Sequence, residues 1–329
     1  MVVQLIRNQQ VVSSSLIASS NFQKHGVGCM NLCDVNVIKR IMAKHQTGTK
    51  KSFGQNFLIN RSIPMSIAEE SYSYHRARNP QENCSVIEIG PGIGCLTNEL
   101  CLCYDKVVAV EIDKTLLPIL EETLGEHQNL TVVNEDFLKI DLDSFIKEHF
   151  GSSSVSVCAN LPYYITTPII MKLLESARSE TGKSPLTSIT VMVQKEVAER
   201  LCATEKHGDY GAITASISYY GQAVKLFDVS PDNFLPSPKV TSSVIRIELY
   251  DEPIYKVKSE KMLFKVIEGA FAQRRKTMLN SLSSVFSNIS KGRIGEIIEE
   301  LGFDINIRGE KLSIESFCAL ADKFCEELE

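Results

Sequence analysis

The sequence predicts an α/β protein: a Rossmann-like domain with a mostly parallel sheet and an antiparallel extension, followed by a small all-helical C-terminal domain. Between Cys84 and Val193, short β-branched runs alternate with helical stretches, a pattern typical of a parallel sheet covered by helices. Further strand-like runs then follow one another with only turn residues between them, which favours antiparallel pairing. From Lys261 onward, apolar residues recur at helical intervals, so we expect helices to close the chain.

The first 29 residues contain no acidic residue and are rich in serine around Ser13. We expect residues 1–29 to be an extension that is either disordered or the result of a start codon assigned too far upstream. In the second case, Met30 is the true first residue. Organelle targeting by this segment is the weaker alternative to a cytoplasmic location. From Asn31, an apolar stripe with a period near 3.6 predicts a helix.

The strands and helices follow in order along the rest of the chain. The expected parallel strands are residues 85–89, 106–112, 130–134, 155–159 and 188–193, and the expected antiparallel strands are residues 213–220, 224–229 and 243–249. Phe264, Ile267 and Phe271 begin the helical pattern, and Gly292 and Gly302 are its later breaks. We therefore predict an extension (1–29), a Rossmann-like domain with an N-terminal arm (30–250) and a helical domain that contacts RNA or the ribosome (251–329).

The composition is that of a globular protein, with 43% hydrophobic and 23% charged residues among 329. No apolar run reaches the roughly 18 residues of a membrane span, so we expect no membrane contact. The ten cysteines include no Cys-x-x-Cys pair, which predicts reduced thiols, no metal and no disulfide framework.

The charge is distributed unevenly, although the net charge is only −5. Residues 1–60 contain seven Lys or Arg and one acid, hence +6, whereas residues 61–250 contain sixteen basic and twenty-five acidic residues, hence −9. A basic arm before an acidic body is compatible with a nucleic-acid partner.

The most informative glycines lie in residues 86–94, where a strand runs into a glycine-rich turn before a helix that begins near Leu96. Glycine lets a ligand approach the backbone closely. The dinucleotide pattern Gly-x-Gly-x-x-Gly is absent, because the glycines stand at 90, 92 and 94 and Cys95 follows. This spacing favours a mononucleoside cofactor such as S-adenosylmethionine, with Gly90 at its site.

Acidic residues end the next two predicted strands. Glu111 lies about twenty residues beyond the glycine turn, where an acid accepts hydrogen bonds from ribose hydroxyls. Asp136 follows the third strand and can accept from the adenine amine of the cofactor. Each acid alone could be a solvated turn residue, but three successive strand ends with compatible chemistry predict a cofactor site.

The fourth predicted strand ends in Asn160-Leu161-Pro162-Tyr163, which resembles the Asn/Asp-x-Pro-Tyr/Phe signature of enzymes that methylate exocyclic amines of bases. The Asn160 side-chain oxygen and the Leu161 carbonyl can accept from the two amine N–H groups, while Pro162 fixes φ near −65°. Tyr163 can stack on a base that has left its helix. Phe234, in a loop stiffened by two prolines, is the candidate for the other stacking face.

Together, residues 51–58, the glycine turn, residues 160–163 and residues 234–240 resemble the ribosomal RNA adenine dimethyltransferase family. The resemblance covers roughly residues 31–329, and residues 270–279 resemble its bacterial small-subunit branch, which dimethylates two adjacent adenines near the 3′ end of 16S RNA.

The resemblance implies S-adenosylmethionine as the cofactor, and it adds Asn56 and Leu58 to Gly90, Glu111, Asp136 and Asn160 as cofactor-binding residues. It also implies ribosomal RNA in an immature small subunit as the partner. The sequence carries no signal for the oligomeric state, and a monomer is the default expectation. The predicted RNA contacts are Lys50, Lys51, Arg274, Arg275 and Lys276.

Three alternatives remain open from the sequence. A large-subunit enzyme of the macrolide-resistance type would keep the reaction, but it lacks the match in residues 270–279. A DNA adenine methyltransferase would need a sequence-reading domain, and we find none in the sequence. A non-catalytic ribosome-assembly factor predicts decay of the glycine turn or of residues 160–163, and neither has decayed.

Overall fold

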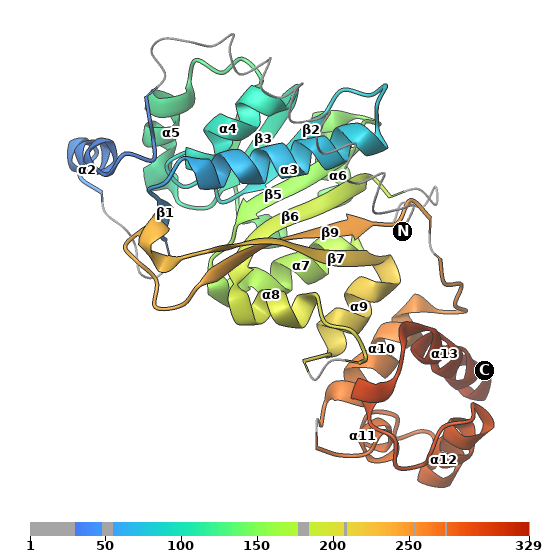
Figure 1. Cartoon of the computed structure of the whole chain (residues 1–329). Coiled ribbons are helices and arrows are strands. Elements are labelled where there is room, and N and C mark those ends of the chain that lie inside the picture. The colour runs from blue at the N-terminus through green and yellow to red at the C-terminus, as the bar shows by residue number, and fades with distance from the viewer. Residues whose placement is uncertain are drawn as a thin grey trace, which may run out of the picture.

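The computed structural model describes residues 30–47, 55–176, 184–206, 209–252, 254–273 and 275–328. A seven-stranded sheet with strand order β4-β3-β2-β5-β6-β9-β7 forms its centre (Figure 1). The strands from β4 to β6 are parallel, whereas β9 and β7 run antiparallel, so the predicted fold class is confirmed. The strands are β2 (Ser85–Ile89), β3 (Lys106–Glu111), β4 (Leu130–Asn134), β5 (Val155–Asn160), β6 (Leu186–Gln194), β7 (Gly221–Val229) and β9 (Ser242–Leu249), with a separate two-stranded pair of β1 (Phe57–Leu58) and β8 (Phe234–Leu235).

Helices cover both faces of the sheet, because successive side chains of its central strands point to opposite faces and both sets are apolar. In β2, Val86 packs into one core cluster and Ile87 into the other. The helices are α2 (Val35–Lys44), α3 (Ser62–Arg78), α4 (Cys95–Cys103) and α5 (Leu117–Leu124) over one face, and α6 (Leu142–Phe150), α7 (Thr166–Glu175), α8 (Lys195–Leu201) and α9 (Ala212–Tyr220) over the other.

One predicted strand is wrong: residues 213–220 belong to helix α9. The Ile, Thr and Tyr content favours a strand locally, but the surroundings bury both sides of this segment. Tyr220 stacks on Phe264 with ring centroids 5.5 Å apart, and the Thr214 side chain accepts from the backbone N–H of Gly211 to cap the helix. Packing against the C-terminal helices therefore overrides the local preference.

The C-terminal helices are α10 (Glu260–Phe271), α11 (Met278–Val285), α12 (Lys291–Glu300) and α13 (Ile314–Leu328). Figure 1 shows them grouped beyond the end of the sheet, with α10 next to α9. Gly302, with φ +80°, follows the end of α12 as expected. The break expected at Gly292 is wrong, because Ser290 caps α12 and Gly292 is its second residue.

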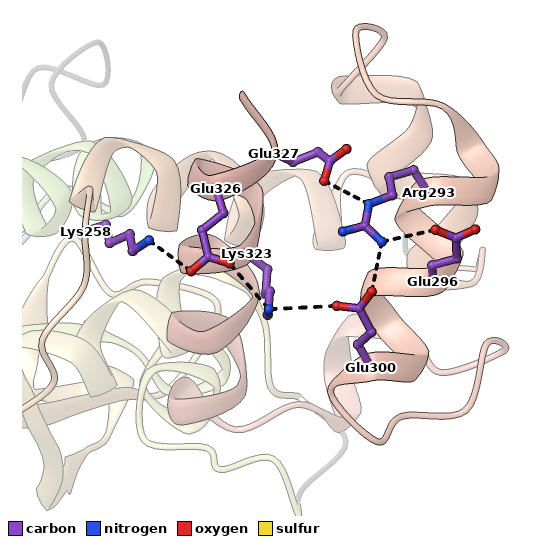
Figure 2. A network of polar contacts seen from close by, with 7 residues as sticks. All are labelled: Lys258, Arg293, Glu296, Glu300, Lys323, Glu326 and Glu327. Carbon is purple, nitrogen blue, oxygen red and sulfur yellow. Dashed lines mark hydrogen bonds and ion pairs between the residues drawn. The ribbon is translucent and has the colours of Figure 1, made fainter. Parts of the chain in front are cut away.

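Ion pairs join α12 to α13 across the surface of this helical group (Figure 2). Arg293 binds Glu327 through Nε at 2.8 Å and Glu300 through Nη1 at 2.8 Å, and Glu296 lies within 3.1 Å. Such exposed pairs contribute little individually. The stability of this helical group therefore rests mainly on fully buried side chains such as Phe317.

In the described part of the chain, no helix is long and apolar enough to cross a membrane. The nine cysteines found there are all free, and no three potential metal ligands come together among these residues. The extension predicted for residues 1–29 lies outside the described residues.

Candidate active site

The candidate site lies at the carboxyl edge of the parallel strands. Because β2, β3, β4 and β5 run in the same direction, their last residues meet at one edge. Ile89 is in register with Val110 on one side and with Ala159 on the other, so the glycine turn lies between the ends of β3 and β5. The sequence pattern therefore predicted correctly that these strand ends are neighbours.

The turn after β2 leaves open space beside its backbone. Gly90, Gly92 and Gly94 have φ values of +71°, +62° and +95°, which other residues rarely adopt. A Cβ on Gly90 would have no heavy atom within 4 Å, whereas one on Gly94 would lie 2.6 Å from Leu124. Gly94 is thus required for helix packing, and Gly90 faces space that a ligand can enter.

A cavity at this turn brings together most of the predicted site. Asn56 and Leu58 of the N-terminal arm line it together with Gly90 and with the tetrapeptide 160–163, whose first residue ends β5. The residues lining it are Gln55, Asn56, Phe57, Leu58, Glu88, Gly90, Pro91, Gly92, Ile93, Cys95, Leu96, Asn160, Leu161, Pro162 and Tyr163. Arm, turn and tetrapeptide are far apart in the sequence, yet they share one cavity.

Asn160 is oriented by the arm. Its Nδ2 donates to the Asn56 carbonyl oxygen at 3.4 Å, which leaves the amide oxygen as a free acceptor within the described structure. The Leu161 backbone N–H donates to the Met192 carbonyl oxygen of β6 at 3.3 Å. This bond fixes the backbone whose carbonyl is the second predicted acceptor.

Tyr163 is half-buried, and a hydrogen bond of its hydroxyl group restrains its ring. The Tyr163 hydroxyl lies 2.8 Å from the Ser242 Oγ, and Ser242 is fully buried at the start of β9. Pro162, with φ −57°, precedes it as expected. The ring therefore has a fixed place in the cavity wall, as a stacking face requires.

Glu111 supports the glycine turn directly. Its Oε2 accepts from the Gly92 N–H at 3.2 Å, and its Oε1 accepts from the Asp113 N–H at 2.8 Å. Burial raises the pKa of Glu111, while these two backbone N–H groups lower it. A carboxylate has about four acceptor positions, so the side chain can still accept from ribose hydroxyls, although it does not line the cavity in this structure.

Asp136 and Phe234 also lie outside the lining of the cavity. Asp136 is half-buried after β4 and accepts from the Leu138 N–H at 3.1 Å, so it lies at the expected edge. Phe234 is 3% exposed and pairs with Leu58 between β1 and β8. The expectation that a loop presents the Phe234 ring is wrong, because strand pairing places this ring in the core.

The predicted RNA contacts are only partly described. Arg275 and Lys276 are exposed in the turn between α10 and α11, rather than on a helix. Lys50, Lys51 and Arg274 lie outside the described residues.

Glu88 is a site residue that the sequence analysis missed. It is 2% exposed at the wall of the cavity, and its Oε2 has no hydrogen-bond partner within the described structure. Burial raises its pKa to about 8. A cationic ligand in the cavity would favour the ionised carboxylate. The available signal was an acid in the middle of an otherwise apolar strand.

We expect Glu88→Gln to stabilise the protein much more at pH 8 than at pH 5. The unfolded chain releases this proton near pH 4, whereas the folded protein keeps it up to about pH 8. The stability from this group is therefore complete below pH 4 and is lost as the pH rises toward 8. Thermal melts should show that Glu88→Gln has a higher Tm than wild type, by on the order of 5 °C at pH 8 and by much less at pH 5. Equal effects at both pH values, or the same pattern in the exposed control Glu126→Gln, would contradict this assignment.

Two exposed apolar side chains follow the strand-end acids. Ile112, after Glu111, is 49% exposed, and Leu138, after Asp136, is 38% exposed. Exposed apolar side chains at a strand edge are suited to pack against the planar base of a bound nucleoside. They are further candidates for cofactor contacts, and the sequence signal was an apolar residue shortly after each acid.

A nucleoside with a cationic side chain fits this site, since Gly90 leaves room for it and the Glu88 oxygen lacks a partner. The fold and the site together define the class of S-adenosylmethionine-dependent methyltransferases that act on an amino nitrogen. The sequence profile of the family described as ribosomal RNA adenine dimethylase matches residues 46–325, and the chain belongs to this family. S-adenosylmethionine is accordingly its cofactor.

Similar proteins agree with this membership. A ribosomal RNA small subunit methyltransferase A from Alkaliphilus oremlandii is 44% identical over 290 residues, which cover 88% of this chain and 96% of the relative. The protein of the same name from Lachnoclostridium phytofermentans is 46% identical over 281 residues, with 85% and 92% covered. Among solved structures, a dimethyladenosine transferase from Plasmodium falciparum has a TM-score of 0.64 at 22% identity, with 82% of this chain and 98% of that chain covered. The last comparison shows the shared fold.

Proposed function

We propose that this protein transfers methyl groups from S-adenosylmethionine to N6 of two adjacent adenines near the 3′ end of 16S ribosomal RNA. The observation that carries this proposal is the 40–46% identity, over 85–90% of the chain, to proteins named as small-subunit methyltransferases. We further propose that it acts as a monomer on an immature small subunit during ribosome biogenesis.

The tetrapeptide is suited to the chemistry of an adenine amine, whose lone pair is delocalised into the ring. In this proposal, the amide oxygen of Asn160 and the Leu161 carbonyl accept from the two N–H groups and so favour the pyramidal nitrogen; the bond from Asn160 Nδ2 to the Asn56 carbonyl and the position of both residues at the cavity support it. S-adenosylmethionine supplies the methyl group on its sulfonium. Holding the amine in line with that methyl group accounts for most of the rate enhancement.

Tyr163 supplies one stacking face for the adenine, which must leave its stack to reach the cavity. No general base is needed in the transition state, because the amine proton becomes acidic once nitrogen is alkylated and passes to water. The other face has no residue assigned, since Phe234 is buried. Exposed Arg275 and Lys276 are suited to phosphate contacts beyond the target base.

Methyl transfer from labelled S-adenosylmethionine identifies the substrate. The protein would be incubated separately with immature small subunits, large subunits and duplex DNA, and the label in each nucleic acid would be counted. We expect label in small-subunit RNA and background with the other two. Label in large-subunit RNA alone would support the resistance-type alternative. Cofactor binding without any RNA labelling would support an assembly factor.

A further inference from the structure

An unusually exposed aromatic ring follows the catalytic tetrapeptide. Tyr164 is 61% exposed, the highest value among the large apolar side chains exposed in the described residues. Its hydroxyl has no hydrogen-bond partner there. Neighbouring Tyr163, in contrast, is half-buried and bonded to Ser242. The two adjacent tyrosines therefore differ in role, since one lines the cavity and the other faces solvent.

Single exposed apolar residues are common and need no explanation, but their distribution here is not uniform. Of the six large ones, four lie at the carboxyl edge that holds the site: Ile112, Leu138, Tyr164 and Val240. The first three follow β3, β4 and β5. Val240 precedes β9, whose first residue, Ser242, pairs with the last residue of β6. This grouping indicates a surface that ligands cover.

The turn that carries Tyr164 is held firmly. The Ile165 N–H donates to the Pro162 carbonyl oxygen at 3.1 Å, and the Tyr163 hydroxyl bond ties the turn to Ser242. The segment just before Ser242 contains Val240 and Lys239. Lys239 is exposed and forms no ion pair with any described residue. An exposed aromatic ring on a held turn and a cation without an ion pair among the described residues thus lie on segments that meet beside the cavity.

We propose that Tyr164 stacks on the base of the nucleotide next to the target adenine, and that Lys239 contacts the phosphate beside that base. The proposal rests on the function proposed above. When one base is extruded into the cavity, its neighbour loses a stacking partner. The exposed ring replaces that partner, and aromatic stacking suits any base because every base has a π-face.

Tyr164→Ala and Tyr164→Phe test this role in methyl transfer to immature small subunits. We expect Tyr164→Ala to raise KM for the subunit about 5- to 150-fold, with kcat and S-adenosylmethionine affinity close to wild type. Tyr164→Phe keeps the aromatic face and should behave as wild type. Glu126→Ala removes an exposed side chain beyond α5, outside the site and outside the predicted RNA-contacting helices, and should have no effect. The affinity for the small subunit falls as salt rises, and Lys239→Gln should make the slope of log affinity against log salt less steep by about one.

Three results would overturn the proposal. They are an unchanged KM for Tyr164→Ala, an equal loss for Tyr164→Phe, and a parallel loss of cofactor affinity that points to a structural role. If wild-type protein labels no small-subunit RNA, the proposed function fails instead. In that case, binding of a single-stranded RNA with two adjacent adenines decides the role of Tyr164 separately, because stacking predicts weaker binding by Tyr164→Ala alone.

Discussion

Asn160→Ala should abolish methyl transfer to small-subunit RNA while the protein still binds S-adenosylmethionine. The change removes one of the two acceptors that hold the target amine, and loss of one aligned polar group in an active site costs kcat about 10²- to 10³-fold. The cofactor should lose only a modest part of its affinity, because Asn160 is one of several predicted cofactor contacts and the others remain, although its bond to the Asn56 carbonyl is lost. Single-turnover transfer and calorimetric titration of the cofactor measure the two quantities.

Two further variants test whether the loss of activity is specific to the acceptor oxygen of Asn160. Asn160→Asp keeps an oxygen acceptor but loses the donor to Asn56, so we expect activity between those of wild type and the alanine variant. Asn36→Ala removes an exposed amide at the start of α2 and should leave turnover unchanged. Normal turnover by purified Asn160→Ala would defeat the catalytic assignment.

Glu111→Ala should have its largest effect on cofactor affinity. The substitution removes the acceptors proposed for the ribose hydroxyls, and it also releases the Gly92 N–H that Glu111 now holds. Hydrogen bonds to a charged group contribute about 1.5–3 kcal/mol each, so Kd for S-adenosylmethionine should rise roughly 10- to 100-fold or more. Titration calorimetry measures this change, and kcat at saturating cofactor should fall much less.

Glu111→Gln separates the two roles of this side chain, since it keeps the shape and one acceptor oxygen. We expect its Kd to lie between those of wild type and Glu111→Ala. Glu126→Ala, which removes an exposed acid beyond α5, is the matched control. An unchanged Kd in Glu111→Ala would exclude this residue from the cofactor site.

The parallel sheet and the position of the site were predictable from the sequence for a physical reason. Strands buried on both faces have continuous apolar sequences rich in β-branched residues, and residues 107–110, with three valines and one alanine, are such a run. Once the strands are known to be parallel, Gly90, Glu111 and Asn160 must lie at one edge. The structure adds the N-terminal arm opposite them, where Asn56 and Asn160 are in contact.

Features that depend on distant packing were not predictable in the same way. Residues 213–220 have a strand-like composition, but neighbouring helices enclose them and they form a helix. Phe234 is followed by a proline-rich loop, yet its pairing with Leu58 buries it. The raised pKa of Glu88 depends on the closed surroundings of one side chain. In each case the deciding contact joins residues that are far apart in the sequence.

Mass spectrometry of the 3′-terminal RNA fragment tests the central claim most directly. Immature small subunits lacking the modification would be incubated with S-adenosylmethionine and either wild-type protein or Asn160→Ala. Dimethyladenosine at two adjacent adenines with wild type, and unmodified adenines with the variant, is the predicted result. Unmodified adenines with wild type, although the cofactor binds, would contradict the account.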